Sequence, residues 1–210
     1  MIQKKMLVIS GPQGSGNHVW SKIFALHPAV YGWKALNQTY WIGHDQEPFA
    51  ECWADTNRLK EFNWNQSDYY VTSVSCPYMN NGERTVPNLV SFAAQALGCG
   101  IDVQFAILGR DRNILGFQET RVRGEPTFNL AIEQYRKLAT WNPVYLSYEL
   151  LQLYQGAYLQ QLSILLEFPM DYGNSQIDEI LKDDTNQKYF QPVEHHPTDD
   201  LARHTSRKWQ

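Results

Sequence analysis

The chain is poor in cysteine and has no long hydrophobic run. These two absences argue against a cysteine-ligated zinc protein and against a membrane protein. It has only three cysteines in 210 residues, unevenly spaced, and no two of them have the spacing of zinc ligands. No apolar run approaches the length of a membrane span, and the apolar stretch near the N-terminus is too short for a signal peptide. We therefore expect reduced thiols in a soluble, cytoplasmic protein with no membrane partner.

Basic residues are not in excess either. The formal net charge is -4, with 18 lysines and arginines against 22 aspartates and glutamates. A general nucleic-acid or anionic-membrane binder normally shows a basic excess, so we expect neither partner. With 43% hydrophobic residues the chain can fill one sizeable core, and we predict a single domain over residues 1–210.

The first motif is a glycine-rich loop between an apolar strand and a helix. The strand covers 6–9, the loop carries Gly11, Gly14 and Gly16, and helix periodicity resumes at Asn17. Glycines permit positive φ and close backbone approach, so successive N–H groups can point into one concavity at the helix N-terminus. We expect this loop to bind a phosphate or a sulfate. The alternative is a turn that only connects the strand tightly to the helix.

This loop departs from the nucleotide-binding pattern G-x-x-x-x-G-K-[ST] at two positions. Gly11 and Gly16 fit the pattern, but Asn17 stands in place of the lysine and His18 in place of the serine or threonine. The sequence therefore predicts an anion site without the usual chemistry of nucleotide hydrolysis. A P-loop kinase or NTPase remains the alternative enzyme class.

Strand-like and helix-like segments alternate along the chain. We predict strands at 6–9, 29–33, 68–75, 101–108 and 162–168. We predict helices at 17–26, 48–54, 56–62, 88–97, from 114, from 127, at 144–158 and at 175–181. The alternative to separate helices from 127 and at 144–158 is a single helix kinked at Pro143. This alternation favours an α/β fold of three layers, a parallel sheet flanked by helices, with ligands at the carboxyl ends of the strands.

Two segments do not fit the alternation. Residues 34–67 mix polar and aromatic residues without a clear period, and we interpret them as an insertion that shapes a substrate pocket. Residues 183–210 form a polar tail. Its histidines, with Asp199 and Asp200, reflect composition more than ligand geometry, so no metal site is predicted.

Arginines gather after the predicted strand 101–108. Arg110 and Arg112 lie where this strand leads into a helix, and Arg121 and Arg123 lie at the end of that helix. Guanidinium groups suit bidentate phosphate binding, and the carboxyl end of a strand is where this fold presents its ligand. Arg110 is the main candidate for binding a phosphate. For Arg121 and Arg123 the alternative is that they are solvent-exposed residues at a helix end, where a positive charge interacts favourably with the helix dipole.

Together these segments, from Met6 to Leu181, resemble the sulfotransferase superfamily. In that family a loop P-[KR]-[SG]-G-[TS] wraps the 5′-phosphosulfate of the donor PAPS (3′-phosphoadenosine 5′-phosphosulfate), and Pro12–Asn17 is similar to it. A motif R-D-P-x-D-x-x-x-S, which supplies an arginine and a serine for the 3′-phosphate of the donor, resembles Arg110-Asp111 with Gln118 at the serine position. A downstream strand that reads Y-E-D-L resembles Leu166–Phe168 loosely.

The resemblance implies a P-loop NTPase/sulfotransferase-like fold, PAPS as co-substrate, and sulfuryl transfer to a hydroxyl or amine of a small-molecule or glycan acceptor. It assigns donor binding to Gln13, Gly14, Ser15, Gly16, Asn17, Arg110 and Gln118. A non-catalytic nucleotide-binding protein of the same fold is a further alternative.

The family's catalytic groups are missing from two positions. The lysine or arginine of its first loop falls on Gly14, beside Gln13, and its catalytic histidine falls on Ser75. A positive charge and a base must therefore come from elsewhere in the chain. We take His18, in the first turn of the helix after the loop, as the candidate catalytic residue, with Lys22 and His44 as substitutes; a histidine bonded within the fold is the alternative for His18.

Overall fold

The computed structural model describes residues 3–39, 42–80, 82–118 and 127–182. The five strands of its central sheet are β1 (Lys4–Pro12), β2 (Val30–Tyr31), β3 (Tyr69–Cys76), β6 (Ile101–Gly109) and β7 (Val144–Ser147). All of their pairings are parallel, and their spatial order is β2-β3-β1-β6-β7. β1 is therefore the central strand, between β3 and β6. A separate antiparallel hairpin is formed by β4 (Tyr78–Asn80) and β5 (Glu83–Thr85).

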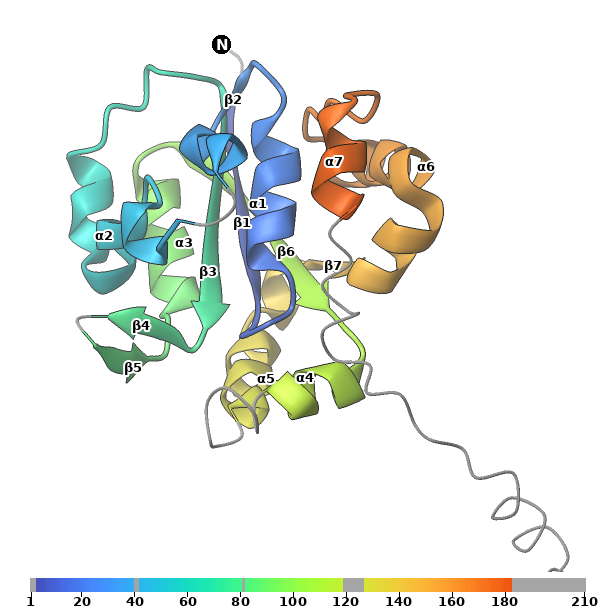
Figure 1. Ribbon diagram of the computed structural model, residues 1–210. Helices are drawn as coiled ribbons and strands as arrows, with labels where there is room; N and C mark the ends of the chain where they lie inside the picture. The colour runs from blue at the N-terminus through green and yellow to red at the C-terminus, as the bar shows by residue number, and fades with distance from the viewer. Residues whose placement is uncertain (1–2, 40–41, 81, 119–126, 183–210) are drawn as a thin grey trace, which may run out of the picture.

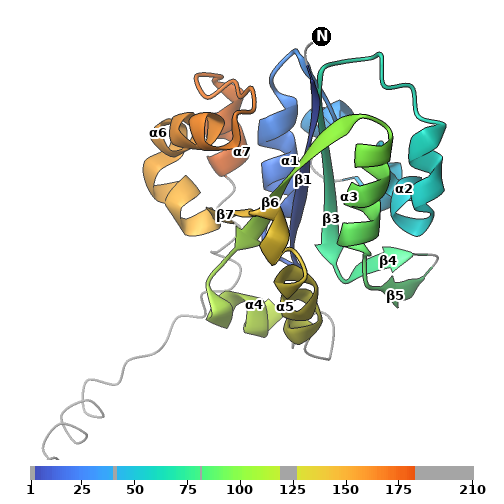
Figure 2. The same ribbon diagram turned by 180° about the vertical axis from the view of Figure 1, so that it is seen from behind.

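Helices cover both faces of the sheet (Figures 1 and 2). They are α1 (Asn17–Ala25), α2 (Ala50–Ala54), α3 (Leu89–Gly98), α4 (Arg112–Gln118), α5 (Phe128–Arg136), α6 (Tyr148–Leu166) and α7 (Gln176–Lys182). Short 3-10 helices lie at Lys34–Gln38, His44–Gln46, Thr56–Lys60 and Ala139–Trp141. The predicted α/β fold of three layers is confirmed.

The apolar run of β1 explains why it lies at the centre. Met6 and Val8 pack into a core cluster with α3 and the 49–59 segment, whereas Leu7 and Ile9 pack on the other face against α1 and α6. All four side chains are fully buried. A strand that reads as continuous apolar residues is typical of a parallel sheet covered on both faces.

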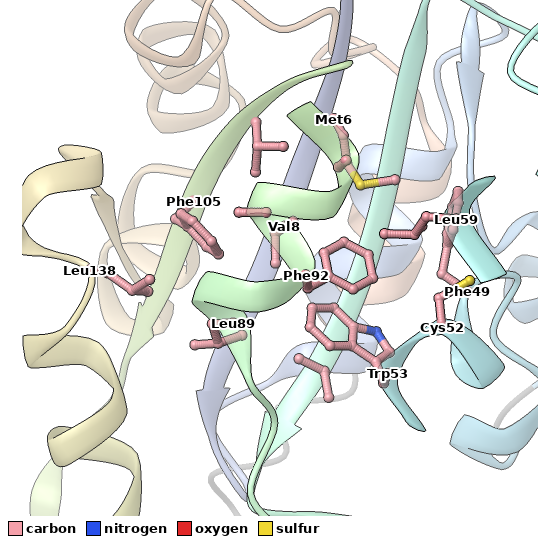
Figure 3. Close-up of a cluster of buried hydrophobic side chains, with 14 of the residues drawn as sticks. Met6, Val8, Phe49, Cys52, Trp53, Leu59, Leu89, Phe92, Phe105 and Leu138 are labelled. Carbon is pink, nitrogen blue, oxygen red and sulfur yellow. The ribbon is translucent and has the colours of Figure 1, made fainter. Parts of the chain in front are cut away.

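The first core cluster combines aromatic and aliphatic side chains (Figure 3). Trp53 of α2 stacks on Phe92 of α3, with ring centroids 3.9 Å apart and an interplanar angle of 13°. The Trp53 Nε1–H also donates a hydrogen bond of 3.3 Å to the Thr72 hydroxyl in β3. These contacts fix α2, and with it part of the 34–67 segment, on the sheet.

The sequence analysis misplaces one strand of the last third and the start of one helix. The strand expected at 162–168 is largely the end of α6, and the fifth strand is Val144–Ser147, where a helix was expected. Leu159, Leu162 and Leu166 are buried at helical spacing, while Ile164 is 74% exposed, so this apolar run has the period of a helix and not of a strand. Leu166–Phe168 is consequently no counterpart of the family's downstream strand.

The alternative of a single helix kinked at Pro143 is also wrong. Residues 144–147 pair with β6 and are not helical, so no helix runs through Pro143. The irregularity in α6 is at Gln155, which has a φ of 43° and a ψ of -120°. None of the described helices is both long and apolar enough to cross a membrane.

The core contact between α2 and α3 can be tested by truncation. Phe92→Ala removes a fully buried ring, and we expect it to lower the free energy of unfolding by about 3–5 kcal/mol in urea denaturation. Leu153→Ala in α6 is the control, because Leu153 is 72% exposed and its loss should change stability by less than about 0.5 kcal/mol. Equal losses in the two variants would contradict this description of the core.

Candidate anion-binding site

The glycine loop lies at the carboxyl end of the central strand. β1 ends at Pro12, the Ser15 N–H donates to the Pro12 carbonyl at 3.0 Å, and α1 begins at Asn17. Gly14 and Gly16 have φ values of 89° and 100°, a region that favours glycine. Gly11 is required for a different reason, because a Cβ there would lie 2.0 Å from Ser15 Oγ. The loop can therefore fold tightly only with these glycines.

The N-terminus of α1 has no side-chain cap. Its N-cap is Gly16, and its first turn has no acidic residue. The first N–H groups of a helix have no intrahelical partner, and the helix dipole makes this end positive. These amides can therefore bind an anion, as the sequence predicts.

Arg110 supplies a positive charge at this loop. It follows β6, the neighbour of β1 in the sheet, and its Nη1 donates a hydrogen bond to the Gly14 carbonyl. The guanidinium carbon lies 4.7 Å from the centroid of the Tyr148 ring. A Cβ on Gly16 would lie 3.1 Å from the same ring, so Tyr148 packs against both the loop and Arg110. Arg110 thus places one positive charge beside Gly14 from the end of the strand next to β1.

The backbone around Arg110 is held by hydrogen bonds. The Asp111 N–H donates to Glu149 Oε1 at 2.8 Å, and Asp111 Oδ1 accepts from the Asn113 N–H at 2.8 Å. Ser147 caps the N-terminus of α6 through the Leu150 N–H. Asp111 therefore has a structural role, since it caps α4 and ties the turn before it to α6.

Polar side chains of the loop are buried. Gln13, Ser15 and Asn17 are 8%, 0% and 4% exposed, and Asn17 Nδ2 donates a hydrogen bond of 2.9 Å to the Ser75 hydroxyl in β3. Within the described part of the chain, Gln13 Oε1, Ser15 Oγ and Asn17 Oδ1 are buried without a hydrogen-bond partner. Buried polar atoms are normally paired, and a side-chain amide can present either its oxygen or its N–H groups. This unmet capacity is consistent with a polar ligand at the loop.

The histidine proposed as catalytic contacts the 42–44 segment. His18 Nε2 lies 3.0 Å from the Ile42 carbonyl, and its ring centroid lies 4.4 Å from that of His44. Burial lowers the pKa of His18, and the nearby Lys22 lowers it further. Its catalytic role remains a prediction. The substitute Lys22 donates to the Thr39 carbonyl.

Three of the predicted features lie wholly or partly outside the residues that the structure describes. Gln118 is the last residue of α4, but its side chain is not among those described. Arg121 and Arg123 lie outside the described residues, as does the 183–210 tail with its histidines. The structure thus brings together Gln13–Asn17 and Arg110 among the predicted site residues.

A cavity of about 430 Å³ adjoins the loop beside β3. It is lined by His44, Asp45, Ala50, Glu51, Trp53, Ala54, Asp55, Arg58, Ser73, Val74, Ser75, Tyr78, Met79 and Asn80. Ser75, which accepts the hydrogen bond from Asn17, connects this cavity to the loop. Much of the lining comes from the 34–67 segment, as the pocket-shaping interpretation requires. The lining residues carry no motif, so sequence reasoning missed most of them.

Two buried titratable groups of the 34–67 segment are neutral at pH 7. Burial raises the pKa of Glu47 to about 8, although its Oε2 accepts a hydrogen bond of 2.8 Å from the Phe49 N–H. Burial, with a smaller effect of His18, lowers the pKa of His44 to about 4. His44 therefore lines the cavity as an uncharged ring.

No group of three or more His, Cys, Asp or Glu side chains is placed to hold a metal ion in the part of the chain that the structure describes. No protein-family model and no curated protein matches the chain. Among solved structures, it is similar to the tunicamycin resistance protein of Deinococcus radiodurans, with 14% identity and a TM-score of 0.45 over 80% of this chain and 98% of that one. Function is therefore inferred from the site itself, and the resemblance to sulfotransferases remains a prediction.

The protonation of Glu47 predicts a pH-dependent stability. Its pKa is about 8 in the folded state against an ordinary 4.5, so between these values the folded state holds a proton that the unfolded state releases. Stability should therefore fall as pH rises through this window, by up to about 1.4 kcal/mol per unit. Below pH 6.5 the lowered pKa of His44 acts in the opposite sense, so the fall is clearest from pH 6.5 to 8.

Glu47→Gln tests this prediction, because glutamine resembles the protonated carboxyl group. Urea denaturation at pH 6.5, 7 and 8 should show a flatter pH dependence for this variant than for the wild type. Glu61→Gln, at an exposed position, is the matched control. Parallel pH profiles for the wild type and Glu47→Gln would contradict a protonated Glu47.

Proposed function

We propose that this chain binds PAPS at the glycine loop and transfers its sulfuryl group to a hydroxyl or amine of a small molecule or glycan. One observation carries the proposal: the Arg110 guanidinium lies at the glycine loop and donates to the Gly14 carbonyl. A loop of backbone amides with one adjacent guanidinium offers both kinds of donor that bind phosphate and sulfate groups. The cavity beside Ser75 is the place for the acceptor.

The charge of the site favours a phosphosulfate over a triphosphate. The loop has Asn17 in place of the usual lysine and His18 in place of the usual Mg²⁺-binding hydroxyl. Both side chains are engaged in the fold, Asn17 with Ser75 and His18 with the Ile42 carbonyl. A 5′-phosphosulfate carries fewer negative charges than a triphosphate, so a single arginine and a helix N-terminus neutralise a larger share of its charge.

The residues divide into donor-binding and acceptor-side groups. Backbone amides of Gln13–Asn17 hold the 5′-phosphosulfate. The resemblance assigns Arg110 to the 3′-phosphate, but its hydrogen bond to the Gly14 carbonyl favours a contact with the 5′-phosphosulfate instead. Gln118 and further donors remain candidates for the 3′-phosphate. His18 remains the candidate proton acceptor, and it packs against His44, which lines the acceptor cavity as an uncharged ring.

The transfer itself balances with these groups. The acceptor oxygen or nitrogen forms a bond to sulfur, and the bond between sulfur and the bridging oxygen of the 5′-phosphate breaks. The acceptor proton passes to a histidine or to water, and adenosine 3′,5′-bisphosphate leaves. Arg110 stabilises the charge that develops on the leaving phosphate, as electrostatic catalysis of group transfer requires.

Donor binding can be tested with the product alone. Titration calorimetry of adenosine 3′,5′-bisphosphate should give micromolar affinity for the wild type. Arg110→Ala should weaken it about 10- to 100-fold, because a charge-assisted hydrogen bond contributes about 1.5–3 kcal/mol. Arg136→Ala, an exposed residue in the last turn of α5, is the matched control and should bind like the wild type. Absence of binding at high micromolar concentration in the wild type would refute donor binding at this loop.

Turnover separates the proposal from its two alternatives. We expect transfer of label from ³⁵S-PAPS to members of an acceptor panel, and no Mg²⁺-dependent hydrolysis or transfer from ATP. Turnover of Mg-ATP without turnover of PAPS would instead indicate a P-loop kinase or NTPase. Binding of the bisphosphate without turnover of either donor would indicate a non-catalytic nucleotide-binding protein.

A further inference from the structure

We propose that the cavity beside β3 selects a small organic cation, a protonated amine with an apolar or aromatic body. As the identity of the acceptor, this inference rests on the proposed function; as a binding site, it rests on the cavity alone. Its volume of about 430 Å³ lies in the range of small-molecule sites.

The charged residues of the cavity are mainly acidic. Asp45, Glu51 and Asp55 line it, and Arg58 is the one arginine or lysine among the lining residues. Arg58 forms an ion pair with Glu51. The carboxylates of Asp45 and Asp55 therefore leave the lining with a net negative charge. His44 adds no positive charge because burial lowers its pKa to about 4. A cationic ligand is attracted by this rim, and an anionic one is repelled.

The inner wall of the cavity is apolar and fixed. Trp53 is held by its stack on Phe92 and by its hydrogen bond to Thr72. The Tyr78 hydroxyl donates to the Trp53 carbonyl at 3.1 Å, so the second aromatic residue is tied to the backbone of the first. An organic body can pack on these rings, and an ammonium group near an aromatic face gains a cation–π interaction.

A buried polar atom elsewhere in the lining also points to a ligand. Ser73 lines the cavity and is 3% exposed, and its Oγ has no hydrogen-bond partner in the described part of the chain. Buried hydroxyl groups are normally paired. A ligand with an N–H or O–H group can satisfy this oxygen, so the acidic rim is accompanied by an independent sign of a polar occupant.

The position of the cavity orients such a ligand. Ser75 lines the cavity and is bonded to Asn17 of the loop, whereas Asp45 and Asp55 belong to the 34–67 segment. An ammonium group held at these two carboxylates leaves the other end of the molecule toward Ser75 and the donor. The substrate class is therefore an amine that carries a second nucleophilic group, such as an amino alcohol.

The test uses three probes that share a phenylethyl body and differ in the charge of the end group: 2-phenylethylamine, 2-phenylethanol and 3-phenylpropionate. Saturation-transfer NMR and calorimetry without any nucleotide should show the amine bound about fivefold or more tightly than the alcohol, and the carboxylate bound most weakly. The double variant Asp45→Asn/Asp55→Asn should reduce the amine to the affinity of the alcohol. Asparagine keeps the cap that Asp55 provides to the Asn57 N–H, so the fold is preserved.

Asp178→Asn, an exposed change in the first turn of α7, is the matched control and should leave the order of the probes unchanged. Equal affinity for amine and alcohol, or no binding of the amine at millimolar concentration, overturns the inference. Arg110→Ala separates it from the proposed function, because this variant should lose the bisphosphate and still bind the amine. Amine binding without bisphosphate binding in the wild type would refute the donor site and support the cavity.

Discussion

The contact of Tyr148 with both Gly16 and Arg110 is the interaction on which the geometry of the anion site depends. The three residues follow β1, β6 and β7, which are neighbours in the sheet. Parallel pairing brings the carboxyl ends of these strands together, although the residues are up to 132 positions apart in the sequence. The tyrosine is fully buried, so its ring limits where the loop and the guanidinium can lie.

The fold and the loop could be predicted from the sequence because their signals are local. The strand at 101–108 and the helix at 88–97 follow directly from apolar runs and from glycines and proline at their ends. Residues 144–147 could not be identified in this way, because a strand of four residues after a proline has too few positions to show a period. The error there also concealed Tyr148, whose place beside the loop depends on β7 being a strand.

The position of the Arg110 side chain is likewise a tertiary property. The sequence indicates that it follows a strand at the ligand-binding edge, but not that its guanidinium bonds to Gly14. The cavity was still less predictable, since its lining combines β3, the β4 strand and three short helical segments. The loop carries the positive charge of Arg110, and the cavity carries an excess of carboxylates. The hydrogen bond from Asn17 to Ser75 connects these two oppositely charged sites.

The shortness of β2 accounts for the existence of the cavity. β2 pairs only with Tyr69 and Tyr70, so the outer edge of β3 beyond these residues has no strand neighbour among the described residues. An open edge can pair with another chain and aggregate. Here the 42–58 segment covers it, with the buried Glu47 and Trp53 against β3. The same segment thus protects this edge from pairing with another chain, and substitutions that loosen it are expected to lower solubility as well as to alter the cavity.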